Sequence, residues 1–140
     1  MTQERHVFEA LQKAVTAAVA GTNSPPVKYL NRNFNPPSTG MWWEIIMIPN
    51  NIANEFWGSE ETYRGILRLL LHSPQNDKGV YPLLDEVERV SQGFAKGSKF
   101  IDPASEVVVS VTDNPTIMGV YEEPPQIIAA LTVRYSCFKP

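Results

Sequence analysis

Cysteine is almost absent from this chain, in which Cys137 is the only one among 140 residues. A lone thiol can form neither an intrachain disulfide nor a metal site made of several cysteines. The fold must therefore be held without covalent cross-links, which suits a protein of a reducing compartment, and we interpret Cys137 as a packed thiol. A single domain of this length, residues 1–140, buries roughly two thirds of the surface of its unfolded chain, so it needs no cross-link.

Histidine is scarce as well, since only His6 and His72 occur. No serine or cysteine lies in a nucleophile-elbow pattern such as GxSxG, and no glycines match the phosphate-binding patterns GxGxxG or GxxxxGK[ST]. The carboxylate pairs Glu60-Glu61 and Glu122-Glu123 are sequence neighbours, which point in opposite directions on an extended chain. We therefore expect no catalytic residues, no metal site and no cofactor, and expect that the protein is not an enzyme.

Long apolar runs and clusters of positive charge are also missing. No stretch reaches the roughly 18 apolar residues of a membrane-spanning helix, and the N-terminal sequence MTQERHVFEALQ contains no apolar segment of the kind found in signal peptides. The formal net charge is -3, the isoelectric point is near 5.4, and no run of Lys or Arg occurs. These values argue against binding to nucleic acid or to a membrane.

Proline, by contrast, is plentiful. The chain has 12 prolines, mainly in the doublets Pro25-Pro26, Pro36-Pro37 and Pro124-Pro125. Adjacent prolines stiffen a connection between elements and do not by themselves mark a domain boundary. No internal repeat or low-complexity tract is present, so one domain is the expected organisation.

Two segments have the spacing of amphipathic helices. The first is predicted from about Gln3 to Ala20, with Thr2 placed to cap it and Gly21 placed to end it. The second begins around Pro82 and ends near Gly97, and Gly93 within it is expected to permit a close approach to a neighbouring element. The apolar stripes are Val7, Leu11, Ala14, Val15, Ala18 and Val19 in the first helix, and Val80, Leu83, Leu84, Val87, Val90 and Phe94 in the second.

The centre of the chain contains two apolar runs, Met41–Ile48 and Thr62–His72, joined by the polar loop Pro49–Glu61. Alternation of side chains predicts two strands. Further strands are predicted at Glu106–Thr112 and Ile127–Cys137, with a weak candidate at Val27–Leu30 and a short one at Ile117–Tyr121. This order of elements predicts an α+β fold, in which two helices pack on one face of a single mixed or antiparallel β-sheet of about five strands.

The predicted strands have one fully apolar face and one mixed face. If the two central strands pair, Glu44 is expected to reach Arg64 or Arg68 across the ladder, in an exposed ion pair of about 0.2 to 1 kcal/mol. Two helices can cover only the apolar face, so the mixed face resembles a protein interface and favours self-association. The alternative is a monomer in which these residues lie singly under long loops. The mixed face comprises Trp42, Glu44, Ile46, Ile48, Arg64, Ile66, Arg68, Leu70, Ile128, Ala130, Thr132 and Arg134.

The series MWWEIIMIP, then WGSEETYRGILRLLLHSPQNDKG, then a helix ending in Phe94, then PPQIIAALTVRY, resembles the tail terminator family of long-tailed bacteriophages and related prophage proteins, over roughly Thr2 to Tyr135. The resemblance implies a small α+β protein that forms a hexameric ring on the finished tail tube, stops its polymerisation and presents a surface for head joining. The implied partners are further copies of itself, the tail tube protein and the head-tail connector protein. The implied location is the virion tail, after assembly in the host cytoplasm.

A ring of identical subunits uses heterologous contacts, so each subunit must offer two different complementary patches. We expect the mixed face to supply part of one patch, and loops on the rigid scaffold to contact tube and head proteins. Trp57 is either an anchor of such a loop or a side chain folded back over the sheet edge. The predicted patch residues are Ile46, Arg64, Ile66 and Arg68, and the predicted loop contacts are Asn50, Asn51, Glu55, Phe56, Trp57, Gln75, Asn76, Asp77 and Lys78.

Two alternatives stay open at the level of sequence. A head-completion, connector or other minor tail protein of the same virion would share this composition. A small-ligand binding module or enzyme would instead need a buried polar cluster between the helices and the sheet, which the apolar faces do not offer.

Overall fold

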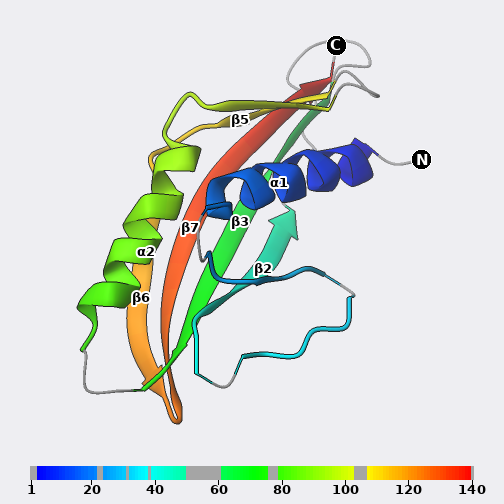
Figure 1. Ribbon diagram of the computed structural model, residues 1–140. Coiled ribbons are helices and arrows are strands. Elements are labelled where there is room, and N and C mark those ends of the chain that lie inside the picture. The colour runs from blue at the N-terminus through cyan, green and yellow to red at the C-terminus, as the bar shows by residue number, and fades with distance from the viewer. Residues whose placement is uncertain are drawn as a thin grey trace.

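The computed structural model of the protein describes residues 3–21, 24–30, 32–37, 39–49, 61–75, 79–102 and 107–139. Within these residues lie two α-helices, one short 3-10 helix and seven strands (Figure 1). Their bounds are α1 (Gln3–Val19), β1 (Val27–Lys28), β2 (Trp42–Pro49), β3 (Glu61–Pro74), α2 (Tyr81–Ser91), η1 (Gln92–Phe94), β4 (Lys99–Asp102), β5 (Val107–Val111), β6 (Thr116–Glu123) and β7 (Gln126–Lys139).

The sheet is built around β3 and β7, two antiparallel strands of 14 residues each that pair along their whole length. The strand order is β1-β2-β3-β7-β5-β4, and β6 also pairs with β7. The outer edge of β7 is shared by two strands, because β6 pairs with its first half and β5 with its second half. All pairings are antiparallel except the short parallel one between β1 and β2.

The predicted α+β class is confirmed, but the sheet is a curled one with seven described strands, and the prediction of about five is too low. The strand Lys99–Asp102 was missed because it has four residues and only two of them are apolar. The short strand predicted at Ile117–Tyr121 extends over Thr116–Glu123. Most side chains of this strand are exposed, whichever face of the sheet they point to. Its sequence therefore lacks the regular alternation of apolar and polar residues that marks a strand with one buried face.

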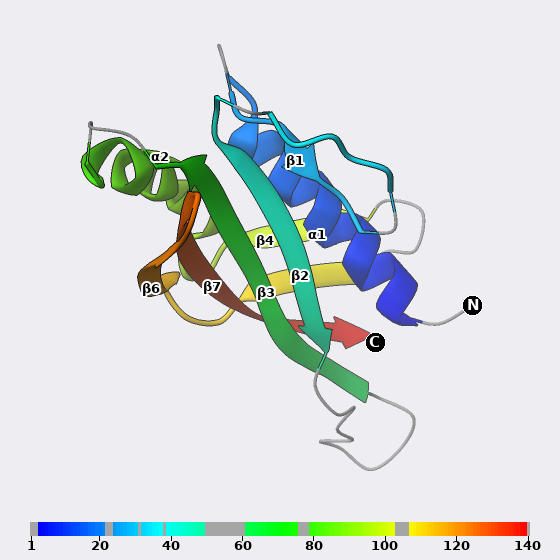
Figure 2. The same ribbon diagram turned by 90° about the horizontal axis from the view of Figure 1, so that it is seen from below.

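The core lies between the helices and one face of the sheet. Figure 2 views the opposite face, with β2, β3 and β7 nearest the viewer and both helices on the far side. The apolar faces of the strands and the apolar stripes of the helices are buried there, as predicted from their periodicity. The largest fully buried side chains are Trp43, Phe94, Leu11, Ile45, Leu67, Leu69, Leu71, Leu131, Val7, Val15, Val87 and Val90.

The two helices begin and end close to the predicted residues. Helix α1 ends at Val19, and α2 has Pro82 in its first turn and passes into the 3-10 helix, which ends at Phe94. Gly97 lies beyond that end with a φ of 91°. A Cβ on Gly93 would lie 2.9 Å from the Cβ of Ala18, so this glycine does permit the predicted close approach between the two helical segments.

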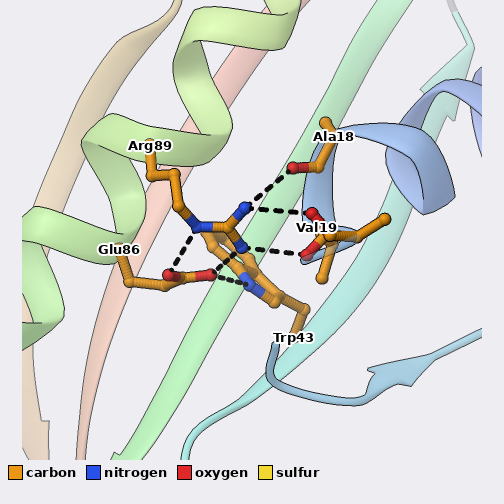
Figure 3. Close-up of polar contacts among 6 residues, drawn as sticks. Ala18, Val19, Trp43, Glu86 and Arg89 are labelled. Atoms are coloured by element: carbon orange, nitrogen blue, oxygen red, sulfur yellow. Dashed lines mark hydrogen bonds and ion pairs between the residues drawn. The ribbon is translucent and has the colours of Figure 1, made fainter. Parts of the chain in front are cut away.

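One arginine joins both helices to the sheet (Figure 3). The guanidinium of Arg89 on α2 donates hydrogen bonds to the carbonyl oxygens of Ala18 (3.3 Å), Val19 (2.9 Å) and Ala20 (3.4 Å) at the C-terminal end of α1. It also forms a forked contact with Glu86, with Nε 2.9 Å from Oε2 and Nη2 2.6 Å from Oε1. Glu86 Oε1 in turn accepts a hydrogen bond of 3.4 Å from the indole nitrogen of Trp43 on β2.

These contacts satisfy carbonyl groups that a helix end otherwise leaves without partners, and they place a positive charge at the negative end of the helix dipole. The hydrogen bond to Glu86 raises the pKa of Arg89 above its ordinary value, against a smaller opposing effect of burial. Glu86 therefore favours the charged form of Arg89.

Replacing Arg89 by Ala should lower the free energy of unfolding by about 2 kcal/mol, because three carbonyl groups and the Glu86 carboxylate lose a charged donor. Arg89→Lys should recover less than half of the loss, since an ammonium group cannot reproduce the planar fork. Chemical denaturation followed by circular dichroism measures both values. Arg5→Ala is the matched control, because it removes the exposed Arg5–Glu9 pair and should cost about 0.5 kcal/mol or less. Equal losses for Arg89→Ala and Arg5→Ala would contradict the joining role.

Gly65 on β3 should tolerate no side chain. A Cβ at this position would lie 2.5 Å from the Tyr135 hydroxyl oxygen and 2.8 Å from the carbonyl oxygen of Ile48, so neighbouring strands would have to shift. We expect Gly65→Ala to lower the free energy of unfolding by about 1 to 3 kcal/mol. Gly119→Ala on β6 is the control, because a Cβ there meets nothing within 4 Å. A thermal denaturation series compares the two, and equal midpoints would show that the sheet accommodates the added methyl group.

Candidate functional site

The face of the sheet that points away from the helices is called here the second face. The register places Ile46 opposite Arg68, and Ile66 opposite both Ile48 and Arg134. Arg64 is exposed, whereas Ile46, Ile66 and Arg68 are half-buried. The four residues of the predicted patch therefore do lie together on the second face, and their part in association stays a prediction.

The open part of the second face is smaller than the sequence suggested. Trp42, Ile128, Ala130 and Thr132 were expected to belong to an accessible mixed surface, but all four are buried. The indole of Trp42 stacks on the imidazole of His72, with ring centroids 3.9 Å apart and planes within 3°, and the ring of Phe34 packs against the same indole at 5.3 Å. Phe34, in the connection between β1 and β2, thus covers Trp42 on the second face.

His72 lies in a polar network that spans four strands and that sequence reasoning missed. Its Nε2 lies 3.0 Å from Glu44 Oε1 and its Nδ1 lies 3.2 Å from Gln126 Oε1. The second oxygen of Glu44 lies 3.6 Å from the ammonium of Lys28. The predicted pairing of Glu44 with Arg64 or Arg68 is wrong, because the register places Glu44 opposite Leu70, far from Arg64, and its carboxylate turns toward His72 and Lys28.

This network holds strands together and leaves little room for chemistry. Both ring nitrogens of His72 are engaged by neighbours, and one face of the ring is covered by Trp42. A general base needs a nitrogen within hydrogen-bond reach of a substrate proton. The nearby hydroxyl of Ser73 donates to the carbonyl oxygen of Pro74 at 3.3 Å. Trp42 and His72 stand opposite each other in the ladder between β2 and β3, and this pairing would have indicated the network. It is apparent only once the register of the two strands is known.

Three polar atoms of the second face are buried without a hydrogen-bond partner in the part of the chain that the structure describes: Trp42 Nε1, Arg68 Nε and Thr132 Oγ1. Arg68 and Thr132 stand directly opposite each other in the ladder between β3 and β7. A buried donor or acceptor without a partner costs about 1 to 3 kcal/mol. The three atoms therefore lower the stability of the fold at the centre of the second face.

Of the predicted loop contacts, only Gln75 lies in a described segment. Its side chain is exposed, and its backbone nitrogen donates to the carbonyl oxygen of Pro125 at 2.9 Å. The remaining ones fall outside the described residues: Asn50, Asn51, Glu55, Phe56, Trp57, Asn76, Asp77 and Lys78.

The described residues contain no group of three or more His, Cys, Asp or Glu side chains placed to hold a metal ion. Cys137 is buried within the core, as predicted. In the same segments, neither helix has the length and apolar character required to cross a membrane.

Comparison with known proteins relates this fold to one family. A solved structure superposes with a TM-score of 0.79, over 100% of this chain and 99% of that chain, at 19% identity. An identity this low supports the likeness of fold alone. None of the curated proteins matches the sequence. The family described as "Phage tail terminator protein" matches residues 6–135, nearly the whole chain. The chain therefore belongs to the phage tail terminator family.

Proposed function

We propose that this protein caps the phage tail: copies form a ring, with six members as the resemblance implies, which sits on the finished tail tube, stops its polymerisation and offers a surface for head joining. Family membership makes the chain a structural component of the phage tail. The ring, the capping and the head joining are the steps proposed here. The partners would be further copies of the chain, the tail tube protein and the head-tail connector protein, brought together in the host cytoplasm.

The observation that carries the proposal is the state of the second face. The helices cover the opposite face, and on the second face the half-buried Ile46 and Ile66 lie beside Ile48, which is 41% exposed. Packing another protein surface against this region would remove these apolar side chains from water. An isolated subunit leaves them partly in water, whereas a subunit of an assembly does not.

Capping requires recognition and no bond-breaking step, and the described residues suit this. The histidine best placed for chemistry, His72, is occupied by Glu44, Gln126 and Trp42. We therefore infer a non-enzymatic role without a cofactor. A neighbouring role in the same virion, such as head completion, would use a similar ring, and binding to purified tail tubes separates the two. A terminator stops the elongation of tubes, whereas a head-completion protein leaves it unchanged.

Arg64→Glu should weaken ring formation without unfolding the protein, because Arg64 projects from the exposed part of the second face. We expect an unchanged circular dichroism spectrum and an apparent dissociation constant about tenfold higher, as reversal of a charge in a contact commonly costs more than 1 kcal/mol. Sedimentation across a concentration series, alone and with tail tubes, measures the association.

Lys96→Glu is the matched control, since it makes the same charge change at an exposed position in the turn before β4. Association that is equally strong in the Arg64 variant and in the wild type would remove the second face from the contact. A chain that stays monomeric both alone and with tubes would remove the ring itself.

A further inference from the structure

The outer side of α1 carries an open groove with a cavity volume of about 600 Å³. One wall is α1, and the other is the segment that follows β1 and carries Tyr29 and Arg32. Thr16 and Tyr29 join the two walls through their hydroxyl groups, 2.5 Å apart. The volume lies within the range of about 300 to 1,000 Å³ that is typical of binding sites.

The charge in this groove is positive and is not neutralised within the described part of the chain. Its one carboxylate, Glu9, already accepts a hydrogen bond from Arg5 at 2.9 Å and lies 4.0 Å from His6. Lys13 on the first wall and Arg32 on the second form no ion pair with any described residue. The groove thus has one unpaired cation on each wall.

The hairpin between β6 and β7 has the complementary character. Glu122 and Glu123 are the last residues of β6 before the turn, are exposed, and form no ion pair among the described residues. Consecutive strand residues point to opposite faces, so the two carboxylates lie on the two sides of the hairpin. The neighbouring Tyr121 is also exposed, by 46%.

The hairpin is a firm projection. Gln75 at the end of β3 donates its backbone N–H to Pro125 at the turn, and the register continues to the last pair, Glu123 and Gln126. Figure 1 shows the tip extending below the body of the molecule, away from α1, so one copy does not fill its own groove. Two different patches at separate places on one subunit are what a head-to-tail ring requires.

We propose that the tip of the β6–β7 hairpin of one copy docks in the α1 groove of the next copy, with Glu122 and Glu123 meeting Lys13 and Arg32 on the two walls. This inference rests on the proposed ring and adds to the second face two complementary patches that join its members. Tyr121 adds aromatic contact area beside the charges. The contact is electrostatic in large part, so association should weaken as the salt concentration rises.

The test is an exchange of charges between the two patches. The variants K13E/R32E and E122K/E123K should each raise the apparent dissociation constant for association, with or without tail tubes, by about tenfold or more, since each places like charges in contact. The quadruple variant, which carries both changes, should restore association to near the wild-type value. Sedimentation velocity at low and at high salt measures all of them.

The control is D85K/E88K, which reverses two exposed carboxylates on α2 and should leave association unchanged. Thermal denaturation of each variant establishes that it folds.

The docking is overturned if neither double variant weakens association, or if the quadruple variant associates no better than the double variants. A ring on tail tubes would still stand in that case. If K13E/R32E prevents binding to tubes and the hairpin reversal neither matters nor compensates, the groove holds the tube protein and not a second copy. If the wild-type chain neither associates nor binds tubes, the proposed function fails first.

Discussion

The antiparallel ladder between β3 and β7 is the constraint on which the rest of this structure depends. Fourteen register pairs run from Glu61 with Lys139 to Pro74 with Gln126. Because side chains alternate along a strand, a slip of one position would exchange the faces of a whole strand and bring Arg68 into the core in place of Leu67 or Leu69. All other strands attach to the outer edges of this pair, directly or through β2 and β5. The ladder therefore decides both what the helices can cover and what remains on the second face.

The sequence was sufficient to predict those parts of the fold for which the physical signal is local. Every second residue from Leu67 to Leu71 is a leucine, so the face of β3 that enters the core was predictable. Pro82 and Gly93 were interpreted correctly from their backbone properties alone. It was insufficient where the answer depends on which residues stand opposite each other. Alternation identifies the face of Glu44 but not its neighbours across the ladder, so its contact with His72 was missed. The burial of Trp42 likewise depends on Phe34, which arrives from a connection without periodicity.

The same distinction applies to Arg89, which from the sequence is one of several charged residues on the outward side of a helix. In the structure it reaches the end of α1, and its bond to Val19 spans 70 positions of the chain. No pattern within α2 indicates this contact, because the partners are carbonyl groups that any residue could supply. Through Glu86 and Trp43 the contact also connects the helices to β2. The helices and the sheet are thereby held together. The second face and the hairpin therefore belong to one body.

The two candidate contact surfaces differ in what they cost an isolated subunit. Exposed charges such as Glu122, Glu123, Lys13 and Arg32 are hydrated, so they cost the monomer little, and their attraction across an interface acts mainly on the rate and the orientation of encounter. The second face differs, because Ile48 is 41% exposed and Ile46 and Ile66 are half-buried, so an isolated subunit leaves apolar surface in water. Burying that surface lowers the free energy with little dependence on salt, whereas the attraction between exposed charges weakens as the salt concentration rises. A contact through the second face and a contact through the hairpin and the groove would therefore differ in their response to salt.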